Sequence, residues 1–193
     1  TNPLDDKDVV GLIEAQTEAP KKIVTGVITP IFNRLNWIRR YSLGDELLAQ
    51  KINFNFSDPK LNDLSKLISQ SVATNKPEKK ISDSWLFWSE GSVSVGKVDA
   101  STKSSKKDID TNAVTLGMDK KINNQSVHGY TITYIQEDAK VGNKGTSSDI
   151  ESYSFSLYRA FNQGSNNYYE GVLGLSKLDI NNIRKSGSNT LTG

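Results

Sequence analysis

Few residues in this chain could carry out chemistry. His128 is the only histidine and cysteine is absent. A Ser-His-Asp relay would therefore have to use that single imidazole, and no thiolate is available as a nucleophile or metal ligand. One imidazole without thiols also gives no support for a zinc site. The sequence thus argues against an enzyme and gives no reason to expect a cofactor.

The carboxylates are numerous, but their positions favour ordinary structural roles. They cluster at 5–8, where a helix is expected to start and negative charge stabilises the exposed amides, and at 108–110 and 137–138, which are expected to be loops. A calcium loop needs oxygen ligands at alternating positions closed by an acidic residue, and residues 179–182 meet this only in part. We therefore predict no metal site.

Composition narrows the possible partners. The chain has 193 residues, 35% of them hydrophobic, and 24 basic residues stand against 22 acidic ones. This near balance gives no case for a nucleic-acid partner, because no face is forced to be basic. No run of about 18 apolar residues occurs, which excludes a membrane-spanning helix. No signal peptide is visible at Thr1, as expected for a processed or excised fragment or for a cytosolic protein.

The first eighty residues are predicted to be mainly helical. Between Ile23 and Ile38, apolar side chains recur at spacings of three and four, which places them on one flank of a helix. Pro20 should interrupt the helical pattern just before this helix, and Pro30 should kink or divide the helix itself. The basic residues around Trp37 are interpreted as cations near a helix end rather than as a ligand site.

Three shorter segments complete this region. Residues 51–56 alternate and could form a short strand, whereas 58–68 begin with Asp-Pro and continue with the apolar spacing of a helix. Residues 75–80 have the composition of a linker. We therefore divide the chain into a helical region, 1–80, and a second region, 81–193.

The second region consists of alternating segments. In 151–162, Tyr153, Phe155 and Leu157 alternate with serines, which indicates a strand with one apolar and one polar face. Each segment is about as long as a tilted strand needs to be to cross a bilayer. The predicted strands are 85–97, 112–121, 127–136, 151–162 and 167–177.

The connections between these strands alternate in length. Residues 98–111 and 137–150 are long and hydrophilic, whereas 122–126 and 163–166 are short. Outer-membrane barrels show this order, with long loops outside the cell and tight turns in the periplasm. An aromatic girdle would then lie at the turn end of the strands. The aromatic residues predicted there are Trp85, Trp88, Tyr168 and Tyr169.

The ordered series of motifs on these strands resembles the C-terminal translocator domain of the monomeric, type V autotransporters. The series covers about residues 85–178 and includes a "GxD" second strand. Its members are Trp88-Ser-Glu-Gly91 with Val95-Gly96, Val114-Thr-Leu-Gly-Met-Asp119, His128-Gly-Tyr130, Ser152-Tyr-Ser154 with Leu157-Tyr158, and Tyr168-Tyr-Glu-Gly171.

The resemblance implies a twelve-stranded outer-membrane barrel whose pore holds a helix joined to an exported N-terminal passenger. It also implies that the barrel-assembly machinery is a partner. Five strands cannot close a barrel, so the chain is expected to be part of a longer protein or to pair with other strands. The Asn pairs lie in turns or after strands, so the self-cleavage known from some autotransporters is not carried over.

We therefore predict a helical segment followed by an antiparallel β-meander, forming five of twelve barrel strands in the bacterial outer membrane. Alternate residues would face the lumen or the lipid. The lumen-facing residues would be Thr115, Asp119, Thr131, Thr133, Ser154, Ser156 and Glu170. The lipid-facing residues would be Val114, Leu116, Met118, Tyr130, Ile132, Tyr134, Tyr153, Phe155 and Leu157.

One alternative remains open, a soluble α+β binding or interaction module whose helices cover one sheet face. Such a protein would stay in solution without detergent and unfold cooperatively. It would bury the tyrosines, leucines and phenylalanines of the apolar face under its own helices.

Overall fold

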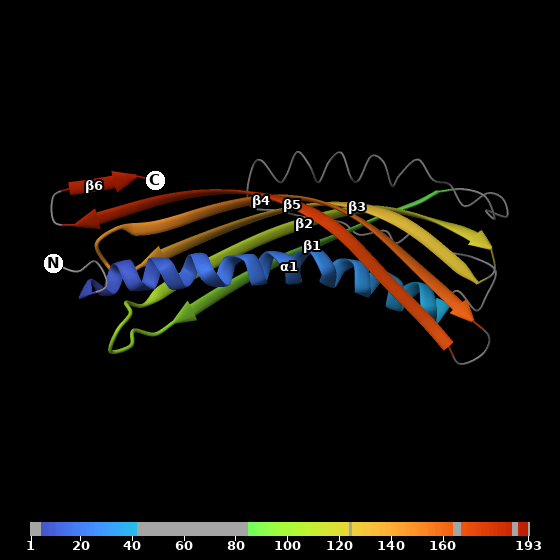
Figure 1. Ribbon diagram of the computed structural model, residues 1–193, viewed down its shortest axis with the longest axis horizontal. Helices are drawn as coiled ribbons and strands as arrows, with labels where there is room; N and C mark the ends of the chain where they lie inside the picture. The colour runs from blue at the N-terminus through green and yellow to red at the C-terminus, as the bar shows by residue number, and fades with distance from the viewer. Residues whose placement is uncertain (1–4, 42–84, 124, 164–166, 187–188, 193) are drawn as a thin grey trace.

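The computed structural model describes residues 5–41, 85–123, 125–163, 167–186 and 189–192. These residues form one helix followed by a curved antiparallel sheet, with the helix on the concave face of the sheet (Figure 1). The expected strand at 51–56, the helix at 58–68 and the boundary at 75–80 lie outside the described residues.

Helix α1, Lys7–Tyr41, is continuous over 35 residues. Asp6 caps it, since Asp6 Oδ1 accepts a hydrogen bond from the Asp8 amide at 3.0 Å. The predicted break at Pro20 and the predicted division at Pro30 are wrong, because both prolines lie inside this helix. Contacts with the sheet hold the helix together where the prolines remove backbone hydrogen bonds, and tertiary packing outweighs the local preference. Within the described parts of the chain, no helix combines the length and the apolar character needed to cross a membrane.

The described strands pair in sequence order, β1 to β6, and each pair is antiparallel. The five long predicted strands are confirmed, and a short sixth strand that the sequence did not indicate follows them. The strands are β1 (Leu86–Val98), β2 (Lys107–Asn123), β3 (Ser126–Val141), β4 (Thr146–Gln163), β5 (Asn167–Ser186) and β6 (Asn189–Thr192).

The strands run further than predicted, and the long loop expected at 137–150 is wrong. Only residues 142–145 separate β3 from β4, in a turn where Gly142 and Gly145 have positive φ angles of 66° and 86°. The hydrophilic residues on either side of this turn are strand residues, and Glu137, Thr146 and Ser148 among them are buried on the face that carries α1. The other expected long loop, 98–111, shrinks to 99–106.

The core lies between α1 and the sheet and forms three buried clusters along the helix. Ala15 packs on Ile109 near the start of α1, Ala19 and Ile23 contact Ile135 and Ile150 in the middle, and Ile31 to Ile38 contact β1, β3 and β4 near its end. Because the sheet curves around the helix, one apolar helix flank contacts the strands from β1 to β5. The opposite face of the sheet contributes nothing to these three clusters.

Candidate functional site

A buried ion pair joins α1 to the inner face of the sheet. Arg34 Nε lies 2.7 Å from Asp119 Oδ2, and Arg34 Nη2 lies 3.0 Å from Asp119 Oδ1. The two side chains are 1% and 0% exposed. A bidentate guanidinium–carboxylate pair fixes both the distance and the angle between its partners, so this contact sets where α1 lies on β2.

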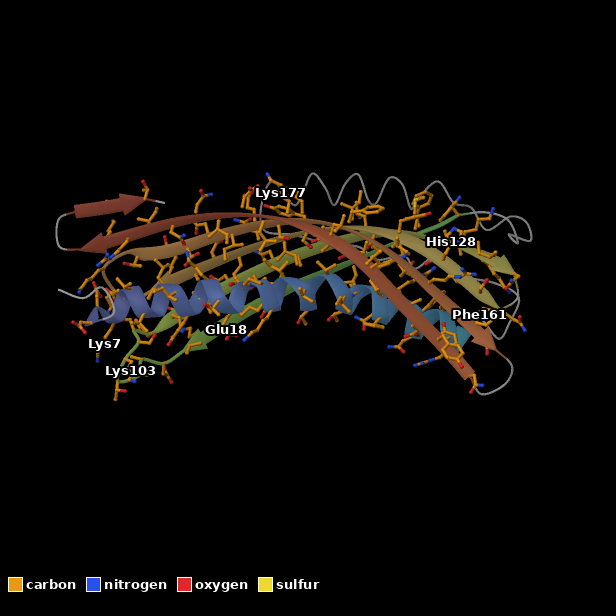
Figure 2. The ribbon with its side chains drawn as sticks, in the orientation of Figure 1. Lys7, Glu18, Lys103, His128, Phe161 and Lys177 are labelled. Carbon is orange, nitrogen blue, oxygen red and sulfur yellow. The ribbon has the colours of Figure 1, made fainter. Side chains whose placement is uncertain are left out.

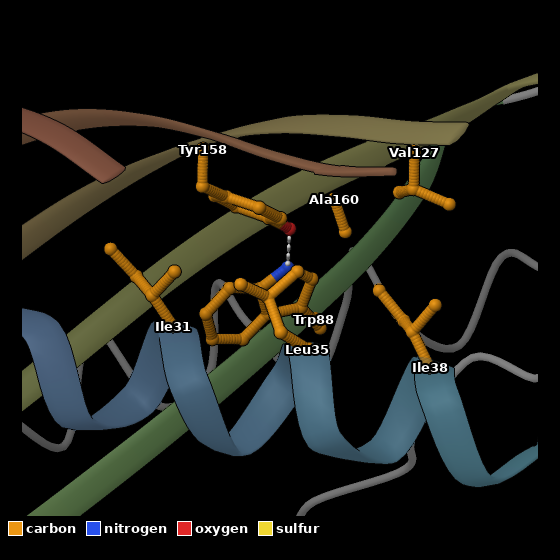
Figure 3. Packing of buried hydrophobic residues seen from close by; sticks show 7 residues of the cluster. All are labelled: Ile31, Leu35, Ile38, Trp88, Val127, Tyr158 and Ala160. Carbon is orange, nitrogen blue, oxygen red and sulfur yellow. Dashed lines mark hydrogen bonds between the residues drawn. The ribbon is translucent and has the colours of Figure 1, made fainter. Parts of the chain in front are cut away.

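Two aromatic residues extend the ion pair across the sheet. The Tyr158 hydroxyl on β4 donates to Asp119 Oδ2 at 2.8 Å, and Trp88 Nε1 on β1 donates to the Tyr158 hydroxyl at 2.9 Å. Figure 3 shows the Trp88–Tyr158 bond among Ile31, Leu35 and Ile38 of α1. These contacts run from Trp88 through Tyr158 and Asp119 to Arg34, and so they link α1 with three strands. We call these four residues the anchor.

Two glycines make room for the anchor rings. Gly117 pairs with Trp88 and Gly129 pairs with Tyr158 across neighbouring strands. A Cβ at either position would lie well inside van der Waals contact with the opposite ring. Each aromatic ring therefore lies over a glycine on the adjacent strand, where no other residue would leave space for it.

The anchor fixes where α1 lies on the sheet more than it adds to the free energy of unfolding. Removing two charges from water costs about as much as their attraction returns, so a buried pair is valuable mainly because other arrangements would leave a charge without a partner. Arg34 Nη1 has no hydrogen-bond partner among the described residues, but the Arg34 guanidinium carbon lies 4.6 Å from the Trp37 ring centre. These contacts therefore hold this face of α1 over Asp119.

A second set of contacts holds the start of α1 at the opposite end of the sheet. Glu14 Oε2 accepts from Lys107 Nζ at 2.5 Å and from the Ser104 hydroxyl at 2.8 Å. Asp8 accepts from the Ser105 hydroxyl, and the Ser105 amide donates to the Lys7 carbonyl at 3.1 Å. We call this set the rim contacts, because it ties the first turns of α1 to the loop 99–106.

Asp6 belongs to the same end of the sheet. The hydrogen bond from the Asp8 amide lowers the pKa of Asp6 below its usual 3.8, and Arg184 at 3.4 Å adds to this, while partial burial opposes it. Because the folded-state pKa is the lower one, the stabilisation is present above about pH 4 and is lost as the pH falls through the folded pKa. The cap of α1 is therefore fully effective at neutral pH.

We expect Glu14→Gln to loosen only the first turns of α1. The substitution removes the charge that faces Lys107, and because half of the Glu14 side chain is exposed, the cost should stay below about 1 kcal/mol. Amide exchange near residues 10–16 should become about threefold faster, while the residues around Arg34 keep their protection. Uniform acceleration along the helix would contradict separate fixation of its two ends.

All seven residues predicted to face the lumen lie on the sheet face that carries α1. Strand pairing places Thr115 opposite Thr133, Thr131 opposite Ser156, and Ser154 opposite Ser176. Six of the seven are buried beneath α1 rather than wetted by an open pore. Glu170, on β5, is partly buried.

The nine residues predicted to face lipid lie on the opposite face of the sheet. Tyr130, Ile132, Tyr153, Phe155 and Leu157 are exposed there, Leu116, Met118 and Tyr134 are partly exposed, and Val114 is buried.

The aromatic girdle is only partly as predicted. Trp85 lies on the outer side, where it contacts His128, and Tyr169 is 57% exposed. Trp88 is an inner-face core residue instead, because the pairing with Gly117 turns it toward α1. Tyr168 also packs against the inner cluster, with the Arg39 guanidinium carbon 5.5 Å from its ring centre.

Sequence reasoning missed the anchor. It placed Asp119 on the inner face and Arg34 near a helix end, but it did not pair them. A signal was available in 152–158, where Tyr158 occupies the same strand face as three serines and so had to point inward. A large polar aromatic residue in a row of small hydroxyl residues indicates a specific partner across the core.

The arrangement can hold a helix against a curved sheet, and this suits a structural role. Within the described ranges, no three histidine or carboxylate side chains converge in a way that could hold a metal ion. The charged groups of the anchor already bind one another.

The comparisons with known proteins agree with this architecture. The family model of the autotransporter β-domain matches residues 87–193, which is more than half of the chain. No curated protein matches, and no solved structure matches. The matched region begins in β1 and includes the meander with Asp119 and Tyr158, so the chain belongs to the autotransporter β-domain family, whose members are translocators of the bacterial outer membrane.

Proposed function

We propose that this chain anchors a passenger attached at the N-terminal end of α1 and supports its export across the outer membrane, without catalysing a reaction. Residues 1–80 would be the linker and pore-helix region, and residues 81–193 would be the first strands of the barrel wall. The observation that supports this most strongly is the distribution of apolar side chains over the two sheet faces.

The outer face of the sheet exposes the apolar residues that a soluble protein would bury. Ile132 is 62% exposed, Leu173 67% and Leu175 79%. At the alternate positions of the same strands, the inner face carries small hydroxyl residues. Helix α1 packs on this inner face and not on the apolar outer face. A soluble α+β module would place its helix on the apolar face, so lipid is the environment that fits this distribution.

The edges of the sheet also favour a barrel. Among the described residues, β1 has no partner on its outer edge, and β6 covers only the last residues of β5. Unpaired backbone groups are untenable in lipid, so in a bilayer the sheet would have to be completed at both edges, by further strands of the protein or by strands of other chains. Closure around α1 would place the helix in the lumen, and twelve strands is the number implied by the family resemblance.

The direction of α1 gives the proposed orientation. Its first turns contact the loop 99–106, and its last turns lie at the end of the sheet where β2 leads into β3 and β4 leads into β5 (Figure 1). With that end of the sheet in the periplasm, the N-terminal end of α1 is at the outer surface, where a passenger would leave the pore. Outer-membrane lipid and the barrel-assembly machinery are the proposed partners during insertion.

Neighbouring residues on β5 provide the test. Leu175 points outward and Ser176 points inward, and both side chains are exposed. In a bilayer, Leu175→Lys should lower the free energy of unfolding by about 3 kcal/mol, because this row lies near the middle of the apolar band. Ser176→Lys should cost about 1 kcal/mol or less, mainly from the lost contact with the Ser154 hydroxyl at 2.7 Å.

The measurement is urea unfolding of the chain in phospholipid vesicles, followed by tryptophan fluorescence. Thr133, which the sequence suggested as a tolerant lumen position, is a poor control because it is fully buried under α1. Equal losses for the two lysine variants, or a chain that folds in buffer and ignores vesicles, would overturn the membrane proposal in favour of a soluble module.

A further inference from the structure

The outer face carries a row of basic side chains at one end of its apolar band. Lys120 pairs with His128, and His128 pairs with Arg159, so three strands place a nitrogen-bearing side chain at the same level. Lys120 and His128 are partly exposed and Arg159 is exposed. Figure 2 shows His128 at the end of the sheet that lies over the last turns of α1, together with Phe161. We call these three residues the basic row.

The opposite end of the same face is acidic. Asp110 pairs with Asp138, and Asp138 pairs with Asp149, in a row parallel to the basic row. On β3, His128 and Asp138 are separated by ten residues, about 34 Å along the strand at ~3.4 Å per residue. At a tilt of about 40°, this corresponds to about 25 Å along the membrane normal, the height of the apolar band in membrane barrels.

The Arg159 guanidinium is charged at every physiological pH, so at the edge of a bilayer it requires a counter-charge. Within the described part of the chain, Arg159 has no acidic partner. Aromatic rings flank the row as they do at a membrane interface, with His128 lying 5.2 Å from the Trp85 ring and 6.0 Å from the Tyr130 ring.

We propose that the basic row binds the headgroups of anionic phospholipids in the periplasmic leaflet. Its level at the edge of the apolar band is where lipid phosphates lie, and its charge is complementary to them. The acidic row at the other edge repels the same headgroups, so the two rows together fix the direction and depth of the sheet in the bilayer. This inference rests on the proposed outer-membrane function and names the lipid that the barrel wall recognises.

The experiment compares urea unfolding of the full chain in phosphatidylcholine vesicles with unfolding in vesicles that also contain phosphatidylglycerol. We expect the unfolding equilibrium constant to fall several-fold when phosphatidylglycerol is present. Arg159→Gln should reduce this preference about fivefold, the effect typical of one cation at an anionic surface, and Arg159→Lys should retain it. Raising the salt concentration should weaken the preference.

Lys140→Gln is the matched control. Lys140 lies on the same sheet face and its loss changes the net charge equally, but it stands in the acidic part of β3. It should alter the lipid preference less than twofold. Insertion into both vesicle types without a preference, or equal losses in R159Q and K140Q, would overturn the lipid site and leave the translocator proposal standing. Failure to insert into either type would overturn both.

Discussion

Arg34→Met is expected to destabilise the folded chain by about 3–5 kcal/mol. The substitution leaves the Asp119 carboxylate, which is fully buried, with the Tyr158 hydroxyl as its remaining hydrogen-bond donor among the described side chains. A buried charge without its counter-ion costs several kcal/mol, whereas the methionine side chain itself fits an apolar helix flank. The measurement is the free energy of unfolding in urea in phospholipid vesicles.

The double variant Arg34→Met/Asp119→Asn separates lost charge from lost packing. Because it removes both charges, it should cost about 2 kcal/mol less than the sum of the two single variants. Arg39→Met is the control, since Arg39 is exposed and, among the described residues, its guanidinium contacts only the Tyr168 ring and the Asn36 side chain. Additive losses in the double variant would contradict a coupled pair, and so would an equal loss in Arg39→Met.

The sequence predicted the overall course of the chain because the two-residue alternation is strong in the middle of each strand. Tyr153, Phe155 and Leu157 could face only one side, and the register of the whole meander follows from such rows. The short alternating stretches near Glu137 and Ile150 were mistaken for loop because their outward side chains are charged. A strand that projects beyond an apolar band carries polar residues on its outer side and so loses the contrast on which alternation depends.

The helix and the anchor depend on tertiary contacts that no local pattern contains. Pro20 and Pro30 favour helix breaks in isolation, but the clusters around Ile23 and Ile31 keep one helix pressed on the sheet. Arg34 and Asp119 are 85 residues apart, and only the folded sheet brings them together. Sequence spacing shows which face a residue occupies, and it does not show which residue on another element meets it.

Gly129→Ala is expected to cost about 4 kcal/mol. The added methyl would overlap the end of the Tyr158 ring and approach the Met118 carbonyl oxygen to 2.7 Å. The ring must then move away from β3, which breaks the hydrogen bond to Asp119. Overpacking accounts for about 1–3 kcal/mol, and the buried polar groups left without partners account for a similar amount.

Gly171→Ala, on strand β5 of the same sheet, is the matched control. A Cβ there would have no atom within 4 Å, so the variant should be neutral or slightly more stable, because alanine restricts the unfolded chain. The pair Gly129→Ala/Tyr158→Leu should be less destabilised than the sum of its single variants, since leucine lacks the ring atoms that meet the new methyl. If Gly129→Ala and Gly171→Ala are equally stable in urea, the ring does not need the space above Gly129, and Tyr158 does not hold Asp119 in place for Arg34.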